Sequence, residues 1–453
     1  MELILINEKD NVAVSSENGH KYAVRDIQKG EKVIKYGFTI GEAVCDIKKG
    51  ERVHTNNLKT LLTGALEYEY EPEFSVPEPQ KPVMINGYLR ADGSVGIRNE
   101  IWVIPTVGCV NGTAKAIAEK TGAFCFTHQF GCSQLGADLE ETQKTLAGLI
   151  KHPNAGGVLV VGLGCENNGI GEMKKALGDY DDRRIRFLNC QDCEDEISLG
   201  FDSVNELRKI ADGDIRTPVP ISKIRLGLKC GGSDGFSGIT ANPMCGIISD
   251  KMISMGASAV LTEVPEMFGA EQTLFRRCAD RSVFCDAVKM INDFKNYYTE
   301  HGQAVSENPS PGNREGGITT LEEKSLGCVQ KGGTAPVTAV IKSGDTVKKG
   351  GLNLLYGPGN DPVAITRLAS AGCQIILFTT GRGTPLGAPV PTIKIATNSA
   401  LAAKKSGWTD FDASSGSADE LMSLLIDVIN GRQTKNEINN FREIAIFKNG
   451  VTL

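Results

Sequence analysis

The chain has 453 residues, of which 40% are apolar and 23% are charged, as in an ordinary soluble globular protein. At roughly 150 residues per domain, this length predicts two to four domains. The formal net charge of −6, with no long block of Lys or Arg, argues against nucleic acid or a membrane surface as the main partner. No apolar run approaches the ~20 residues of a membrane-spanning helix, and the N-terminal residues do not read as a signal or transit peptide. We therefore expect a cytoplasmic protein.

Residues 1–66 contain short valine-rich segments separated by turns, a pattern that predicts a compact all-β module. The sequence Asp-Ile-x-Lys-Gly occurs at residues 26–30 and again at 46–50, as a small internal repeat. Residues 67–84 are rich in proline and glutamate, which favours an extended, solvated linker.

Strand-like and helix-like segments alternate from residue 85 onwards, which predicts parallel α/β domains at residues 85–222 and 223–453. Ligands of such sheets bind beyond the carboxyl ends of the strands. Cys109, Cys132 and Cys165 each follow an apolar run, so we expect them at that edge.

The chain has 13 cysteines, and without an export signal we expect free thiols, metal ligands or catalytic groups rather than disulfides. Cys132, Cys165 and Cys230 are flanked by glycines. Thiolates in such loops suit iron, zinc or an iron–sulfur cluster, and the alternative is that they are buried core thiols.

Three carboxylates lie in comparable positions. Asp234 is inside the glycine-rich segment CGGSDGFSG, while Glu263 and Glu266 flank a proline after a strand. Carboxylates are the hard oxygen ligands that Fe²⁺, Mn²⁺ and Mg²⁺ accept. The alternatives are a helix N-cap for Asp234 and a solvated loop for the two glutamates.

The chain has five histidines. His128 lies in a strand-end loop and is a candidate acid/base group or ligand. His20 and His54 belong to the β-module, where a structural role and a catalytic role are equally compatible with the sequence. His152 and His301 are typical of surface helix ends.

Arg382 and Asn313 lie on glycine- and proline-rich loops. Arginine binds a carboxylate bidentately, so these residues are candidates for anchoring an acidic substrate, with plain surface loops as the alternative.

Many long motifs occur in one order along essentially the whole chain, among them GYLRADGSVGIRNEIWVIPTVGCVNG, HQFGCSQLG, GVLVVGLGCENN, CGGSDGFSGITANPMCG, LTEVPEMFGAEQ, NPSPGNREGG and TTGRGTPLG. Through these motifs the chain resembles the altronate/galactarate dehydratase family, which also includes sulfolactate sulfo-lyases. The resemblance implies an N-terminal β-clip module of the SAF type, a middle α/β dimerisation domain and a C-terminal Rossmann-like domain with an unusual crossover. It also implies a homodimer that depends on Fe²⁺ or, alternatively, Mn²⁺ or another divalent ion.

The segments RVHTNN and EVPEMFGAEQ are similar to the altronate branch of the family. The resemblance therefore implies dehydration of D-altronate to 2-dehydro-3-deoxy-D-gluconate in hexuronate (galacturonate) catabolism. A dehydratase for another aldonate or aldarate such as galactarate, and a non-catalytic sugar-acid-binding protein, are the alternatives. In the sulfo-lyases the β-module is a separate chain, which implies that the module completes the site.

The site that we hypothesise has three sets of residues. The metal ligands would be Cys132, Cys165, Cys230, Asp234 and Glu266. The catalytic groups would be His128, His20, His54 and Glu263, and the substrate-binding residues Arg382, Asn242, Lys35 and Asn313. A cluster held by the three cysteines with one open iron, or a single ion held only by oxygen ligands, are alternatives. Cys125, Cys190, Cys193 and Cys328 are interpreted as structural.

Overall fold

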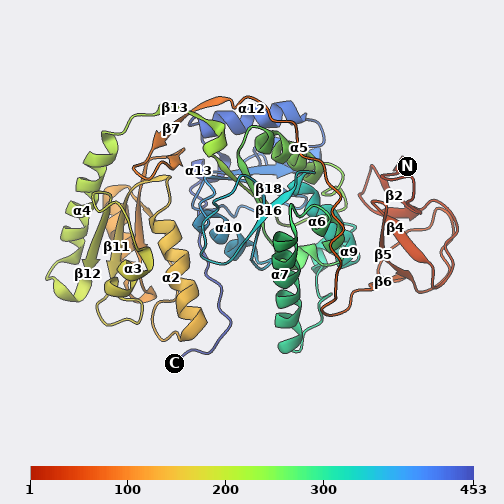
Figure 1. Ribbon diagram of the computed structural model, residues 1–453, viewed down its shortest axis with the longest axis horizontal. Helices are drawn as coiled ribbons and strands as arrows, with labels where there is room; N and C mark the ends of the chain where they lie inside the picture. Colours follow the sequence, from red (N-terminus) through yellow and green to blue (C-terminus); the bar gives the residue numbers. More distant parts are fainter. Residues whose placement is uncertain (1) are drawn as a thin grey trace.

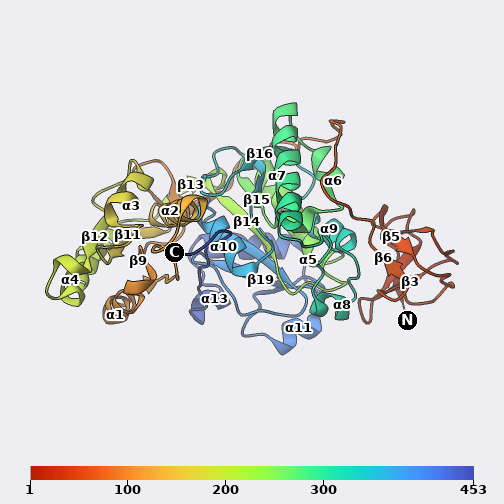
Figure 2. The same cartoon turned by 90° about the horizontal axis from the view of Figure 1, so that it is seen from below.

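The computed structural model describes residues 2–453. Its three folded parts lie in a row, with the C-terminal α/β domain between the N-terminal β-module and the middle α/β domain (Figures 1 and 2). Within residues 2–453, no helix has both the length and the apolar character required to cross a bilayer.

The β-module consists of two small antiparallel sheets. Its strands are β1 (Leu3–Ile4), β2 (Val12–Ser15), β3 (Lys21–Ala23), β4 (Lys32–Lys35), β5 (Phe38–Ala43) and β6 (Leu58–Lys59). The internal repeat joins the sheets, because Ile27 and Ile47 exchange backbone hydrogen bonds of 2.9 and 2.8 Å. Gly30 and Gly50, which close the two copies, both have φ of +83°, a conformation that glycine adopts without strain.

Residues 60–83 contain no helix or strand and run as an extended strap to the start of the middle domain (Figure 1). The strap is not simply solvated, because its tyrosines pack on the C-terminal domain. The Tyr70 hydroxyl donates to the Cys278 carbonyl at 3.0 Å, and the Tyr68 ring meets Phe275 edge-on at 4.7 Å.

The middle domain has a parallel four-stranded sheet in the order β10-β9-β11-β12. Its strands are β9 (Glu100–Pro105), β10 (Phe124–Cys125), β11 (Ala155–Gly162) and β12 (Ile185–Asn189), and its helices are α1 (Asn111–Thr121), α2 (Gly136–Ile150), α3 (Ile170–Leu177) and α4 (Glu196–Asp212). Successive strand residues face opposite sides of the sheet. Val103 therefore packs with α1 and α4, whereas Trp102 packs with α2, α3 and the C-terminal domain.

A three-stranded sheet of β7 (Met84–Leu89), β8 (Val95–Gly96) and β13 (Thr217–Pro220) brings the start and end of the middle region together. The C-terminal tail returns to the middle domain, where the backbone amides of Asn449 and Gly450 donate to the Asp138 carboxylate at 2.8 and 2.7 Å.

The C-terminal domain is built on a parallel seven-stranded sheet in the order β16-β17-β15-β14-β18-β19-β20. Its strands are β14 (Arg225–Cys230), β15 (Ser258–Leu261), β16 (Val337–Ile341), β17 (Gly351–Leu355), β18 (Ile375–Thr380), β19 (Thr392–Ala396) and β20 (Phe411–Asp412). Its helices are α5 (Ala241–Ser254), α6 (Glu271–Phe275), α7 (Arg281–Glu300), α8 (Pro311–Glu315), α9 (Leu321–Cys328), α10 (Asp361–Ser370), α11 (Ser399–Lys404), α12 (Ala418–Ile429) and α13 (Lys435–Ile438). The chain passes from β15 to the edge strand β16 and then returns to insert β17 between them. This step departs from a simple doubly wound order, and it agrees with the expected Rossmann-like domain with an unusual crossover.

Candidate active site

The candidate site lies where the carboxyl ends of β14 and β15 meet helix α9 and the β-module (Figure 2). Helix α9 is buried along its whole length, including the charged residues Glu322, Glu323 and Lys324. Charged side chains are rarely buried unless they are paired. The residues around this helix must therefore supply partners for its charges.

The β-module supplies two lysines to this interior. The Nζ atoms of Lys21 and Lys35 each lie 2.7 Å from a carboxylate oxygen of Glu323. Burial lowers the pKa of Lys21 to about 8. Burial acts in the same direction on Lys35, but Glu323 outweighs it and raises the pKa of Lys35 above its usual range. The lysines hold the pKa of Glu323 well below its usual range, against the effect of burial.

A second group of charges lies at the end of β14. Lys229 forms ion pairs with Glu263 and, at 2.7 Å, with Asp361. Glu263 is buried and has φ of +71°, which is uncommon for a residue other than glycine and is a form of strain found at functional sites. Burial, and then the nearby Cys230 and Glu266, raise the pKa of Glu263 well above its ordinary value.

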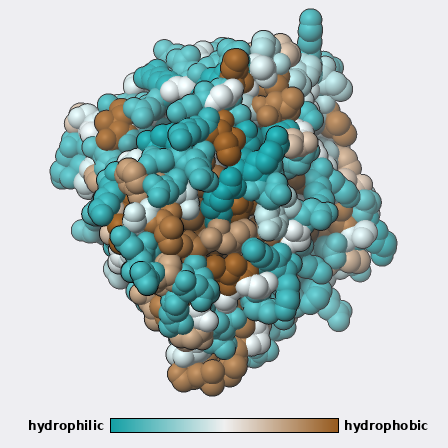
Figure 3. All heavy atoms as spheres, turned by 90° about the vertical axis from the view of Figure 1, so that its left-hand side faces the viewer, coloured by the Kyte–Doolittle hydropathy of each residue, from teal (hydrophilic) through white to brown (hydrophobic). Residues whose placement is uncertain are grey.

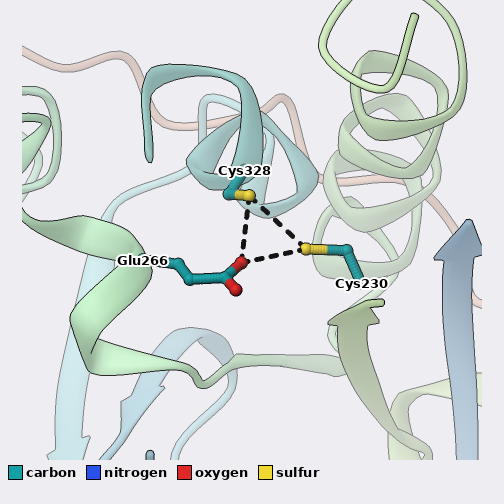
Figure 4. Close-up of side chains that lie close together, drawn as sticks. All are labelled: Cys230, Glu266 and Cys328. Atoms are coloured by element: carbon teal, nitrogen blue, oxygen red, sulfur yellow. Dashed lines mark hydrogen bonds between the residues drawn. The ribbon is translucent and has the colours of Figure 1, made fainter. Parts of the chain in front are cut away.

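Cys230, Glu266 and Cys328 point toward one another from β14, the 3-10 helix η4 (Val264–Met267) and the end of α9 (Figure 4). The Glu266 Oε2 atom lies 3.2 Å from the Cys230 sulfur and 3.1 Å from the Cys328 sulfur, and the sulfurs are 3.4 Å apart. The hydrogen bond from Cys328, helped by Lys331, lowers the pKa of Cys230 to about 6. Burial acts to raise the pKa of Glu266, but Lys324 and Lys229 outweigh it and hold that pKa well below its usual range. The group therefore offers a thiolate and a carboxylate at neutral pH.

This donor set fits a metal ion. Among residues 2–453, Cys230, Glu266 and Cys328 are the one group of three whose ligand atoms all lie within 4.8 Å of one another. Tetrahedral bonds of ~2.3 Å separate two sulfur ligands by roughly 3.8 Å, only slightly more than the spacing found here. Two lysines also contact the group, since Lys331 Nζ lies 2.9 Å from the Cys230 sulfur and Lys324 Nζ lies 2.8 Å from Glu266 Oε1.

The five predicted metal ligands do not all lie at one site. Cys230 and Glu266 belong to the group just described, but Cys132, Cys165 and Asp234 do not join it. Cys132 and Cys165 are exposed at the strand ends of the middle domain, a different sheet from the one that ends in Cys230. Asp234 is buried, and its carboxylate accepts hydrogen bonds from Ser237, Thr397 and Asn398, as expected of a loop-capping residue.

The histidines of the β-module lie together beside the Lys21–Glu323 pair, with the His20 and His54 ring centres 5.8 Å apart. Burial, followed by the charge of Arg52, lowers the pKa of His20 to about 4, so its ring is neutral at pH 7. Burial also lowers the pKa of His54, whose Nε2 atom lies 2.9 Å from the Arg314 carbonyl oxygen.

His128 is buried in the middle domain, where Nε2 lies 2.8 Å from the Pro105 carbonyl and Nδ1 accepts from the Phe130 amide. Both ring nitrogens therefore hold the loop that follows β10. His152 does not lie at the surface as its sequence indicated. It is buried against Trp102 and contacts the Cys373 carbonyl of the C-terminal domain, which covers that helix end.

Two of the predicted substrate-binding residues, Lys35 and Asn242, line a cavity of only about 10 Å³ together with Glu323 and Cys328. Asn313 is buried next to it, where it donates to the Ser233 carbonyl at 2.8 Å. Arg382 stands at the surface and forms an exposed ion pair with Glu315 at 2.7 Å.

Sequence reasoning missed several residues of this site. Cys328 was interpreted as structural, yet it is the third member of the candidate metal group. Sequence reasoning also missed Glu323 and four lysines of the site, which are Lys21, Lys229, Lys324 and Lys331. A signal was present in the segment LEEKSLGC, because Lys324 and Cys328 are four residues apart and share one face of a helix.

Comparison with known proteins agrees with this architecture. Three family models match in order: the altronate/galactarate dehydratase SAF domain at residues 15–61, the D-galactarate dehydratase/altronate hydrolase second domain at 87–212, and the D-galactarate/altronate dehydratase C-terminal domain at 221–452.

Several curated relatives align over most of the chain. It is 50% identical to altronate dehydratase of Escherichia coli K12 over 100% of this chain and 95% of the relative. It is 49% identical to altronate dehydratase of Bacillus subtilis 168 over 99% of this chain and 94% of the relative. Galactarate dehydratase of E. coli K12 is 31% identical over 92% of this chain and 86% of the relative. The chain is therefore a member of the D-galactarate/altronate dehydratase family.

Proposed function

We propose that this protein is a hydro-lyase that converts D-altronate to 2-dehydro-3-deoxy-D-gluconate and water, within hexuronate catabolism. Its identity to altronate dehydratases is about 50%, against 31% to a galactarate dehydratase, which supports altronate as the substrate. The observation that carries the proposal is the pairing of Lys21 and Lys35 with Glu323. This pairing joins the histidines of the β-module to the thiols and carboxylates of the C-terminal domain.

The reaction breaks the C2–H and C3–O bonds, forms a C2=C3 double bond and releases water, after which the enol tautomerises to the ketone. A proton next to a carboxylate is very weakly acidic, so the site must supply both a base and positive charge for the dianionic intermediate. His20 and His54 lie beside the Lys21–Glu323 pair, and the neutral ring of His20 can accept the C2 proton. Glu263 has a raised pKa and can carry a proton toward the departing hydroxyl. We keep His128 only as a residue that positions its loop.

The substrate carboxylate needs a cationic anchor. Arg382 is exposed and its present partner, Glu315, is also exposed, so a substrate carboxylate can replace Glu315 at little cost. Lys35, Asn242 and Asn313 line or adjoin a cavity of only about 10 Å³, so we keep them as candidates for binding the sugar hydroxyls in a site that opens to admit the substrate.

Cys230, Glu266 and Cys328 would hold a divalent ion, for which Fe²⁺ is our first choice and Mn²⁺ the second, because thiolates favour the softer ion. Such an ion supplies Lewis-acid stabilisation of negative charge on oxygen. The protein's own part is to keep Cys230 ionised through Lys331 and to exclude water by burial.

The quaternary structure we propose is a homodimer formed through the middle domain. Leu199 and Phe201 are the large apolar side chains that α4 exposes, at 46% and 40%. Figure 3 looks onto this end of the molecule and shows apolar groups among hydrophilic ones. Light scattering of the purified protein, with L199E/F201E as the variant expected to be monomeric, tests the dimer.

We also place the enzyme in the cytoplasm, since all 13 cysteines are free thiols.

A panel of aldonates and aldarates tests the function. The protein is incubated anaerobically with Fe²⁺ and reductant, and formation of the 2-keto acid is followed with semicarbazide. We expect D-altronate to give the highest kcat/KM and galactarate to react far more slowly. If the protein turns over galactarate and not altronate, galactarate is the substrate instead. Binding of altronate without any product would favour the non-catalytic alternative.

A further inference from the structure

Three exposed thiols stand together at the carboxyl edge of the middle sheet, away from the Cys230 group. Cys109 follows β9, Cys132 follows β10 and Cys165 follows β11. These strands are adjacent and parallel in the order β10-β9-β11, so their carboxyl ends share one edge. Neighbouring strands lie about 4.8 Å apart, which places the three strand ends within a span of roughly 10 Å.

The loops that carry the thiols are bonded to one another. The Gly108 amide donates to the Phe130 carbonyl and the Asn168 amide donates to the Gly131 carbonyl, both at 2.9 Å. The Ser133 amide donates to the Asn167 side chain at 2.8 Å. In each bond, both the donor and the acceptor residue are within three residues of one of the cysteines. The loops therefore hold the three thiols in a fixed arrangement.

The backbone at this edge is specialised for close approach. Glycine precedes each of the three cysteines, and Gly131 and Gly164 have φ of +100° and +128°. A Cβ on Gly131 would lie 2.1 Å from the Thr106 carbonyl oxygen. Ser133, directly after Cys132, has φ of +56°, which costs free energy in a residue other than glycine.

These three thiols are more exposed to solvent than the neighbouring cysteines. Of the 13 cysteines, five are exposed, and three of those five are at this edge. Cys is normally one of the most buried residue types. By contrast, Cys190 and Cys193 follow β12 at the same edge but are half-buried, and the Cys193 thiol donates to backbone carbonyls. Burial raises the pKa of Cys190 to about 11, which disfavours the thiolate form that binds metals.

Unpaired polar atoms lie near the same edge, at the start of α1, in the loop after β11 and at the end of β12. The Oδ1 atoms of Asn111, Asn168 and Asn189 are buried without a hydrogen-bond partner, and Asn168 is fully buried. Buried amide oxygens are normally paired, so three orphans at one edge indicate an arrangement completed by something bound there.

We propose that Cys109, Cys132 and Cys165 bind a [4Fe–4S] cluster. A single ion with bonds of ~2.3 Å requires its sulfur ligands to lie within about 4.6 Å of one another. The three sulfurs do not form a group within 4.8 Å, since among residues 2–453 that condition is met by the Cys230 group alone. A cluster of several irons spans the larger separation, and each thiol gives up its proton as its sulfur binds one iron. Three thiolates leave the fourth iron without a cysteine ligand.

This proposal does not depend on the substrate, so its test measures iron and sulfide. Full-length protein is reconstituted anaerobically with ferric iron, sulfide and dithiothreitol. We expect about four irons and four acid-labile sulfides per chain at this site, with broad visible absorption. C109S, C132S and C165S should each lose the sulfide and the absorption.

The matched controls are C45S and C285S, which change the other two exposed thiols, C193S at the same edge, and C230S in the deep site. All four should keep the cluster. Folding is checked by circular dichroism, and a second measurement needs no variant: in loaded wild-type protein, iodoacetamide should fail to modify Cys109, Cys132 and Cys165 while still modifying Cys45 and Cys285. Binding of iron without sulfide, retention of sulfide by the three variants, or its loss in C230S would overturn the proposal. Loss of altronate turnover with an intact cluster would count against the proposed function alone.

Discussion

Lys35 of the β-module and Glu323 of helix α9 form a buried ion pair 2.7 Å long, although they are 288 residues apart in the chain. Lys21 forms an equally short pair with the other oxygen of the same carboxylate. The contact is supported by neutral hydrogen bonds, such as the one from the Thr320 hydroxyl to the Ile40 carbonyl at 2.6 Å. The β-module is therefore fixed to the C-terminal domain by charges that neither part can leave unpaired.

Substituting Glu323→Ala should destabilise the protein strongly, because two buried lysines lose their counter-charge. Removing one partner of a buried ion pair costs about 3 to 5 kcal/mol. The matched control is Glu315→Ala, which breaks an exposed pair with Arg382 and should cost about 0 to 1 kcal/mol. Urea unfolding of both variants measures the difference. Equal free energies of unfolding would mean that the buried pair does not hold the two parts together.

The stability of the protein should fall as the pH drops below about 6.5 because of His152. Burial lowers the pKa of this histidine to about 3 in the folded state, from the usual value of about 6.5 in an unfolded chain. Between those values the unfolded chain binds a proton that the folded chain does not, so stability is present above the unfolded pKa and is lost toward the folded pKa. The complete loss is on the order of 5 kcal/mol.

Urea unfolding at about pH 7 and about pH 5 tests this in the wild type, in His152→Gln and in His301→Gln. His152→Gln should reduce the pH dependence while lowering stability at pH 7, and the part that remains is the contribution of the other histidines whose pKa is lowered, His20, His54 and His128. His301 is exposed at the end of α7, and its replacement should leave the slope unchanged. An unchanged slope in His152→Gln would show that another group controls the acid sensitivity.

The sequence predicted the elements better than it predicted the site. The alternation of strands and helices, and the glycine-rich ends of the strands, are local signals, and they placed Cys109, Cys132 and Cys165 at one edge correctly. The sequence could not tell which sheet each strand joins. For that reason Cys230 was grouped with Cys132 and Cys165, although it ends a strand of the other sheet.

Burial of polar residues was the other property that the sequence could not reveal. The segment LEEKSLGC has the composition of a solvated helix, yet the β-module covers it completely. Cys328 was interpreted as structural, although its spacing of four residues from Lys324 was a local signal. His152 was expected at the surface because the C-terminal domain that covers it comes more than 200 residues later in the chain.

The deep site should bind Co²⁺ through two sulfurs in metal-free, cluster-free protein. Cobalt thiolate bonds give an intense charge-transfer absorption, whose intensity rises with the number of sulfur ligands. We expect this absorption in the wild type, a reduced one in Cys328→Ser, and weaker Co²⁺ affinity in Glu266→Gln. Cys245→Ser is the matched control, because Cys245 is also buried but lies outside the group. Identical titrations for Cys328→Ser and Cys245→Ser would argue against metal binding there.

The acid side of the pH profile should depend on Arg52, if His20 takes the C2 proton. Burial, and then Arg52 at 2.9 Å from His20 Nδ1, lowers the pKa of His20 to about 4. The ring is then a competent base throughout the range above that value, so kcat/KM in the wild type should stay flat down to about pH 5. Arg52→Met removes the second largest of the causes that lower this pKa and should move the acid limb upward by about one pH unit. Arg25→Met is the control, since Arg25 is in the same module but pairs with Glu31 at the surface.

His20→Gln should lower kcat at every pH. A limb that stays in place in Arg52→Met would assign the base to another group, and His54 would be the next residue to substitute.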